Sequence, residues 1–133
     1  MKSEDFDGKI SIITAVFNAE NHINHLIESL RQQIDPNFEW VVVDGLSTDS
    51  TLEVLKKIDD LNIKIISEAD FGIYDALNKG VKACSGEFYL VAGADDIFLP
   101  NAILDYKEAI EDDVEMVTAN IKIGNKTSTL AQG

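Results

Sequence analysis

Four short apolar segments, each followed by polar residues, constrain the fold of this chain more than any other feature. The segments and the polar residues after them are 10–17 with Asn18, 38–43 with Asp44, 63–66 with 67–70, and 88–92 with Asp95 and Asp96. Apolar runs of this length are typical of strands that are buried on both faces of a parallel sheet. Ligands of open parallel sheets bind outside the carboxyl ends of the strands. We therefore expect these polar residues to converge on one site.

Amphipathic stretches lie between the apolar segments and predict helices. The expected helices cover about 20–33, about 50–58 and about 74–83, with a fourth after Leu99-Pro100. The second helix has a start signal, because Ser50 followed by Glu53 three residues later forms a capping box. The fold class predicted by this alternation is α/β.

Strands that alternate with helices form right-handed βαβ units on a parallel sheet. We predict the strand order 3-2-1-4, which places the first strand centrally. Only a central first strand brings Asn18, Asp44 and Asp96 to one ligand.

The length of 133 residues, of which 45% are hydrophobic, predicts one globular domain. We expect a flexible N-terminal segment over 1–8, a main domain over 9–125 and a polar tail over 126–133. The segment 121–123 has the pattern of an edge strand that lacks a partner, so we expect the natural sequence to continue beyond Gly133.

The charge and the cysteine content exclude several classes of protein. A formal charge of −13 argues against a nucleic-acid partner, because such proteins have a basic face. The sequence has no segment long enough to span a membrane and no signal peptide at its N-terminus. Cys84 is the single cysteine, and its helical spacing from Leu77 and Val81 predicts a small buried filler. These features favour a cytoplasmic location.

The pair Asp95-Asp96 is the most suggestive element of the expected site. Carboxylates gathered at one edge hold a divalent cation well, and they repel an anionic ligand unless the cation is present. We therefore expect a metal-dependent site for a phosphorylated ligand at this edge of the sheet. The alternative is a structural turn, because aspartates are common in turns and at helix N-caps.

The sequence resembles the family 2 glycosyltransferases of GT-A fold. Four segments carry the resemblance: 11–20, which resembles the first strand of the family; 44–51, which matches its Asp-Gly-x-Ser-x-Asp-x-Thr motif; 67–80, which is similar to a signature of one bacterial subgroup; and 93–96, in the place of its Asp-x-Asp-type metal motif. The resemblance implies a Rossmann-like α/β/α sandwich with a mostly parallel central sheet. It covers about residues 9 to 125, the N-terminal, donor-binding portion of such enzymes.

The resemblance also implies roles for individual residues. Phe17 would stack on the nucleotide base, and Asp44 would contact the base or the ribose. Asp96 would bind the Mn²⁺ or Mg²⁺ that bridges the diphosphate, with Asp95 on the ribose or on a metal-bound water. The implied donor-binding residues are Ala15, Phe17, Asn18, Asp44, Asp75, Asn78 and Asp95, and the metal ligands are Asp96 and Asp95.

Some positions leave alternatives open or depart from the family pattern. Lys79 either approaches phosphate or is solvated, and Asp75 either touches the donor or faces water near its helix start. Gly45 stands where many relatives have a second aspartate that contacts the base. Gly93 stands where asparagine or aspartate is common.

The implied function is inverting transfer of a sugar from a nucleotide-sugar donor, with the UDP type favoured. The acceptor would be a saccharide or a lipid-linked saccharide in bacterial cell-surface polysaccharide or lipopolysaccharide synthesis, which is compatible with peripheral membrane association. We expect the general base beyond residue 133. The alternative is a non-catalytic nucleotide or nucleotide-sugar binding module that lacks the acceptor half.

Two further classes fit the sequence less well. A phospho-receiver domain needs an acidic pair after the first strand, and Phe17-Asn18-Ala19 offers none. A sugar nucleotidyltransferase needs a glycine-rich phosphate loop at the same place.

Overall fold

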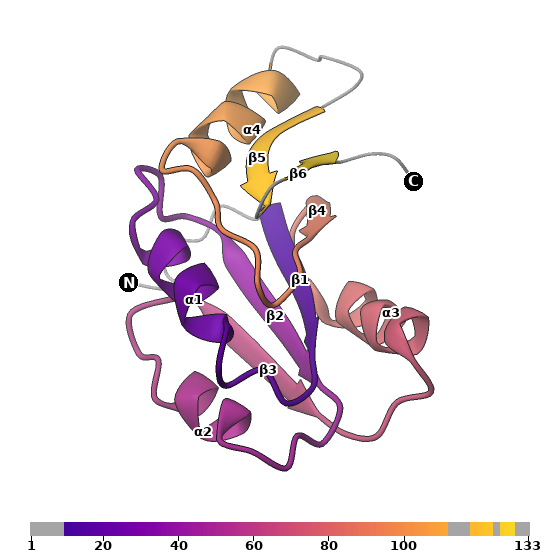
Figure 1. The fold of residues 1–133 in the computed structure, drawn as a ribbon. Helices are drawn as coiled ribbons and strands as arrows, with labels where there is room; N and C mark the ends of the chain where they lie inside the picture. The colour runs from indigo at the N-terminus through magenta and orange to yellow at the C-terminus, as the bar shows by residue number, and fades with distance from the viewer. Residues whose placement is uncertain (1–9, 112–117, 124–125, 130–133) are drawn as a thin grey trace.

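The computed structural model describes residues 10–111, 118–123 and 126–129 (Figure 1). Its elements, in chain order, are β1 (Ile10–Val16), α1 (Ile23–Arg31), β2 (Glu39–Asp44), α2 (Thr51–Lys56), β3 (Ile63–Ser67), α3 (Ile73–Ala83), β4 (Phe88–Val91), α4 (Ala102–Glu111), β5 (Thr118–Ile123) and β6 (Lys126–Thr129). The predicted N-terminal segment 1–8 and the last residues of the predicted tail, 130–133, lie outside this description. None of the described helices is long and apolar enough to cross a membrane.

The first four strands form one parallel sheet with the order β3-β2-β1-β4, which confirms the predicted order. The register aligns the ends of three strands, since Val16 lies opposite Asp44 and Asp44 lies opposite Ser67. The ladder continues past the strand ends. The Gly45 N–H donates to the Val16 carbonyl at 3.0 Å, and the Glu68 N–H donates to the Asp44 carbonyl at 3.0 Å. The residues that follow β1, β2 and β3 therefore emerge side by side.

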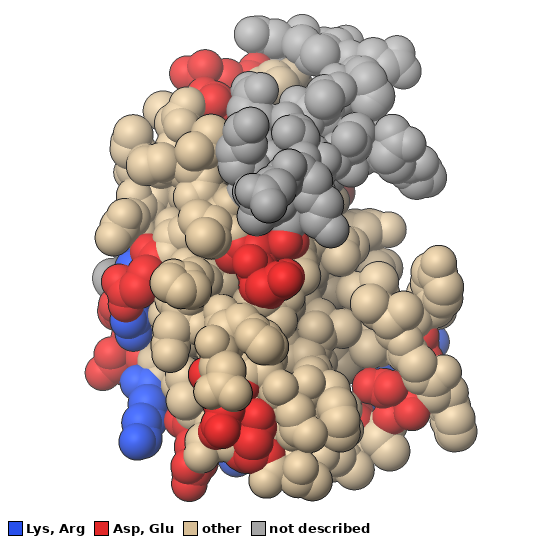
Figure 2. Space-filling view, viewed as in Figure 1, with Lys and Arg blue, Asp and Glu red and all other residues tan. Residues whose placement is uncertain are grey.

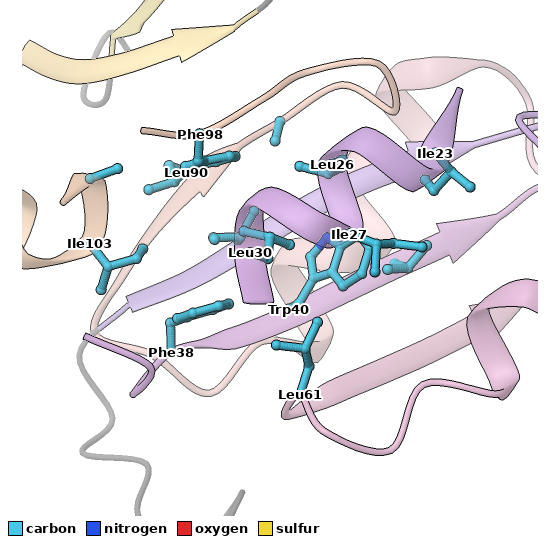
Figure 3. Packing of buried hydrophobic residues seen from close by; sticks show 14 of the residues in the cluster. Ile23, Leu26, Ile27, Leu30, Phe38, Trp40, Leu61, Leu90, Phe98 and Ile103 are labelled. Atoms are coloured by element: carbon cyan, nitrogen blue, oxygen red, sulfur yellow. The ribbon is translucent and has the colours of Figure 1, made fainter. Parts of the chain in front are cut away.

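Helices cover both faces of the sheet, because its strands are apolar on both sides. Helix α1 and helix α3 lie on opposite sides of the sheet in Figure 1. The larger core cluster joins α1, α2 and α4 to one face, and Figure 3 shows Leu26, Leu30 and Phe38 packed around Trp40. The Trp40 indole is fully buried and donates its Nε1–H to the Thr14 hydroxyl at 3.0 Å, so its polar atom is satisfied.

Helix α3 covers the other face through a smaller cluster that contains Ile13, Val41, Val43 and Ala76. Gly80 allows the helix to approach closely, because a Cβ at this position would lie 2.4 Å from Cγ2 of Ile13. Cys84 is half-buried against the same cluster, and its Sγ donates to the Val81 carbonyl at 3.2 Å. The cysteine is thus a packing residue, as its spacing indicated.

Three local expectations were wrong. Ser50 makes no side-chain cap; Asp49 instead accepts hydrogen bonds from the Thr51 N–H at 2.9 Å and the Thr51 hydroxyl at 2.6 Å. The carboxylate reaches these donors from one residue earlier, so the capping box does not form. Helix α1 begins at Ile23 instead of about 20, because the preceding residues form a turn closed on the Ala19 carbonyl.

The third correction concerns the apolar segment near the C-terminus. We expected 121–123 to be a strand without a partner, but β5 pairs with β6 in an antiparallel ladder, with Ile121 opposite Ser128. Strand β6 lies inside the stretch predicted to be a polar tail. The segment contains Thr127 and Thr129, and threonine is β-branched and enriched in strands.

Candidate nucleotide-sugar site

The loops after β1 and β2 are locked together by Asn18. Its side-chain Oδ1 accepts hydrogen bonds from the Thr48 N–H at 2.8 Å and the Asp49 N–H at 3.3 Å. Its own N–H donates to the Ser47 hydroxyl at 2.8 Å. These bonds hold Asn18 at φ 51°, in the left-handed region where asparagine is one of the few tolerated residues. The side-chain oxygen of Asn18, a residue predicted to bind the donor, is therefore engaged by the neighbouring loop.

Asp44 ends β2 and is fully buried, with 0% of its surface exposed. Its Oδ2 accepts from the Ser47 N–H at 3.1 Å and from the Ser67 hydroxyl at 2.9 Å, and its Oδ1 accepts from the Ser47 hydroxyl. The carboxylate therefore connects the end of β2 to the end of β3. Such bonds compensate the cost of burying a charged group.

Asp70 is one of the polar residues expected at this sheet edge after β3, but no individual role was predicted for it. Its Oδ1 accepts from the Gly72 N–H at 3.0 Å, and a Cβ on Gly45 would lie 2.6 Å from its Oδ2. The carboxylate thus occupies the space that a side chain at position 45 would need. A glycine at position 45 together with an acid after the third strand is the signal that was available in the sequence.

Lys79 fixes the loop that carries Asp70. Its Nζ donates to the Ala69 carbonyl and lies 3.4 Å from Glu68 and 3.5 Å from Asp75. Desolvation opposes the charged form of Lys79, but the effect of the two carboxylates is larger, so the pKa of Lys79 is raised above its ordinary value. Asp75 in turn accepts from the Phe71 N–H at 3.0 Å. Both residues, as the structure places them, brace the loop between β3 and α3.

The turn after β4 carries Asp95 and Asp96. The Asp96 carboxylate is buried and its Oδ2 accepts from the Gly93 N–H, whereas Asp95 is exposed. A Cβ on Gly93 would lie 3.3 Å from Asp96 Oδ2 and 3.4 Å from Asp95 Oδ1. Both carboxylates thus lie beside this glycine. The Ala92 N–H ties the turn to β1 by donating to the Ile13 carbonyl at 2.9 Å.

The donor set of this turn fits a hard divalent cation. Carboxylate oxygens suit Mg²⁺ and Mn²⁺, which keep several waters and share their coordination with substrate phosphates. No group of three or more His, Cys, Asp or Glu side chains that could enclose a metal occurs in the part of the chain that is described. Asp95 and Asp96 would therefore hold such an ion only together with a ligand that brings its own oxygens.

The remaining predicted site residues differ in accessibility. Phe17 is 61% exposed and follows β1 directly, beside Gly45 in the register. Asn78 is exposed on α3, and Ala15 is half-buried under α3 in the smaller core cluster. Ala15 can therefore contribute its backbone and shape, while Phe17 offers an aromatic face to solvent.

Acidic groups dominate the charged surface around these loops. Figure 2 shows several clusters of Asp and Glu on this face, with the Lys and Arg side chains mainly at its left margin. An anion that approaches such a surface is repelled unless a cation accompanies it.

The sequence matches known proteins over most of its length. Residues 11–132 match the family model described as Glycosyl transferase family 2. The chain is 31% identical over 121 residues to "Glycosyltransferase GlyA" of Streptococcus pneumoniae serotype 4, covering 90% of this chain and 17% of that protein. It is 36% identical over 108 residues to a "Dolichyl N-acetyl-alpha-D-glucosaminyl phosphate 3-beta-D-2,3-diacetamido-2,3-dideoxy-beta-D-glucuronosyltransferase" of Methanococcus voltae, covering 74% and 34%. The chain thus spans about a third or less of the length of these relatives.

The structure is similar to that of S. aureus TarS 1-349 in complex with UDP-GlcNAc, with a TM-score of 0.73 and 34% identity, covering 81% of this chain and 32% of that one. It is also similar in fold to the mannosyltransferase PcManGT from Pyrobaculum calidifontis in complex with GDP-Man and Mn²⁺, with a TM-score of 0.63 and 24% identity. These neighbours confirm the predicted GT-A fold class. With the family match over residues 11–132, they establish that this chain belongs to glycosyltransferase family 2.

Proposed function

We propose that this chain is the donor-binding portion of a glycosyltransferase that uses a nucleoside diphosphate sugar, with UDP as the favoured nucleotide. One observation carries the proposal: an exposed aromatic residue, Phe17, and the Asp95-Asp96 carboxylates stand at the carboxyl ends of the two adjacent strands β1 and β4. An aromatic face suits a base, and carboxylates with a cation suit a diphosphate. The TarS structure in complex with UDP-GlcNAc supports UDP as the nucleotide.

Six of the predicted site residues have a role in this proposal. Phe17 stacks on the base, while Asn78 and the backbone at Ala15 shape the donor pocket. Asp95 and Asp96 hold Mn²⁺ or Mg²⁺, which when bound offsets the negative charge of the diphosphate leaving group. Asp75 acts on the donor side through the loop that it braces.

The transfer itself inverts the anomeric centre in this proposal, because an acceptor hydroxyl displaces the nucleoside diphosphate in one step. A general base takes the proton of that hydroxyl, and we assign this role to no described residue. The acceptor is a saccharide or a lipid-linked saccharide of a bacterial cell-surface polysaccharide, with synthesis on the cytoplasmic side. The name of TarS, a poly(ribitol-phosphate) beta-N-acetylglucosaminyltransferase, supports this class of acceptor.

Calorimetry with UDP tests the proposal. We expect binding with Mn²⁺ present and little binding in a chelator, because the acidic site repels the diphosphate without a cation. Asp96→Ala should weaken binding more than Asp95→Ala does. Asp60→Ala is the matched control, since this exposed acid precedes β3 at the opposite edge of the sheet. Equal binding with and without metal, or an Asp96→Ala variant that binds like the parent, would contradict the proposal.

A second candidate is a module that binds the nucleotide sugar without turnover. Such a module needs no general base, and we assign that role to none of the described residues. Acceptor-dependent release of UDP from a UDP-sugar would exclude this module, because only an enzyme performs it.

A further inference from the structure

Two residues at the sheet edge adopt a backbone conformation that non-glycine residues rarely use. Asn18 has φ 51° and Leu46 has φ 65°, and they follow β1 and β2 by two residues each. A left-handed residue costs roughly 1–2 kcal/mol and persists only where its surroundings impose it. Because Asn18 follows Phe17 directly, the hydrogen bonds that hold Asn18 also restrain the backbone beside the aromatic residue.

The Ser47 hydroxyl connects the two loops that contain these residues. It accepts the Asn18 N–H at 2.8 Å and donates its own proton to Asp44 Oδ1. The Ser47 N–H donates to Asp44 Oδ2 at 3.1 Å, so this one serine binds both oxygens of the carboxylate. A single hydroxyl thus completes a path from the backbone beside Phe17 to the buried end of β2.

Asp44 has no exposed surface, and Ser47 and Ser67 already supply three donors to its two oxygens. A ligand atom has no route to this carboxylate in the structure. We propose that Ser47 is a positioning residue for the nucleoside end of the donor site, and that Asp44 acts through Ser47 instead of touching the nucleotide. This inference rests on the proposed function, because it concerns how that site is held in shape.

The inference predicts where the effect of losing the hydroxyl is felt. Ser47→Ala removes the hydroxyl that bonds the Asn18 N–H and Asp44 Oδ1. The loop beside Phe17 then has more conformational freedom, and ordering it on binding adds an entropic cost. We expect UDP with Mn²⁺ to bind about tenfold more weakly. Pyrophosphate with Mn²⁺ should bind as to the parent, because the 93–96 turn does not depend on Ser47.

The experiment compares three serine variants by calorimetry with UDP and with pyrophosphate. Ser47→Thr keeps the hydroxyl and should restore UDP binding to within about twofold of the parent. Ser50→Ala is the matched control, because it is the same change in the same loop and the Ser50 side chain caps no helix. It should leave both affinities unchanged. Fluorescence of Trp40, the only tryptophan, verifies that each variant is folded.

A double-mutant cycle with Asp44→Asn separates the two roles of the carboxylate. If Asp44 acts through Ser47, the double variant binds UDP no more weakly than the worse single variant. Losses that multiply would overturn the inference, as would a Ser47→Ala variant that binds UDP like the parent or loses pyrophosphate equally. A parent chain that binds pyrophosphate with Mn²⁺ but not UDP would refute the proposed nucleotide instead.

Discussion

Replacing Gly80 by alanine tests how closely α3 packs on the sheet. Two effects oppose each other. Alanine in a helix interior is favoured over glycine by about 1 kcal/mol, so an open position would gain stability. The new Cβ would lie 2.4 Å from Cγ2 of Ile13 and 3.4 Å from Cγ2 of Val43, whereas carbon atoms pack at about 3.5–4.0 Å. Ile13 is fully buried in a central strand and has no space into which to retreat.

Overpacking of this kind costs about 1–3 kcal/mol, and the contact of more than 1 Å too close favours the upper part of that range. We therefore expect Gly80→Ala to lower the free energy of unfolding by about 1–2 kcal/mol after the helix gain is subtracted. Urea unfolding followed by Trp40 fluorescence measures the change, because this single tryptophan is fully buried. Lys82→Ala, an exposed change in the same helix, should shift stability by less than about 0.5 kcal/mol.

The result also depends on Ile13 in a way that can be checked. Ile13→Ala removes the clashing methyl group and should cost about 2–5 kcal/mol alone. The double variant should lose at least about 1 kcal/mol less stability than the sum of the two single-variant losses, because the new methyl group of residue 80 enters the space vacated at residue 13. A Gly80→Ala chain that is more stable than the parent, or losses that simply add, would refute the packing described for α3.

Three further predictions concern other parts of the molecule. Burial opposes ionisation of Glu39, but hydrogen bonds from Ser85 and Ser11 and the charge of Lys64 lower its pKa. The ionised side chain therefore contributes stability above the ordinary glutamate pKa of about 4.3, and this contribution is lost as the pH falls further. When the pH is lowered from 6 to 3, the urea midpoint should decline less steeply for Glu39→Gln than for the parent. Gly45→Ala should lower the free energy of unfolding by about 1–2 kcal/mol, because the new Cβ displaces the carboxylate of Asp70. Adding Asp70→Ala to this variant should recover most of that loss, as measured by urea titration. The 133-residue chain should release UDP from UDP-sugars no faster when lipid-linked acceptors are added, since we assign a general base to none of the described residues; robust acceptor-dependent release would show that the chain contains a base.

The strands, their order and the sheet edge that carries the site were accessible from the sequence, because apolar runs and βαβ connectivity leave few arrangements open. The run 88–92 was expected to be buried, and this was wrong for three of its residues, because Phe88, Tyr89 and Val91 are exposed in β4. Its place beside β1, which brings Asp95 and Asp96 toward the other strand ends, was predicted correctly. The helix boundaries were less accessible, as α1 shows. Its first turn is displaced by hydrogen bonds between Glu20 and residues 49 and 50, which lie about thirty positions away.

The roles of individual polar residues depended on contacts that no local pattern encodes. Ser50 and Asp49 are both reasonable caps in sequence, and only the position of Thr51 decides between them. The burial of Asp44 follows from Ser67 on the next strand, and the need for glycine at position 45 follows from a carboxylate 25 residues later. Sequence patterns locate such a site, whereas the packing between its loops decides which side chains a ligand can reach.

The strand order also sets when the Asp95-Asp96 turn can form during synthesis. Strand β1 pairs with β2 after a short connection, but its other ladder joins Ile10 to Phe88. At roughly 5–20 residues per second, a ribosome needs about 4–16 s to make the intervening chain. Until then one edge of β1 has no partner, and long-range parallel pairing of this kind is slow to form. Among the loops of the candidate site, the Asp95-Asp96 turn is therefore completed last, and a stalled or cleaved nascent chain would expose an apolar strand edge that favours aggregation.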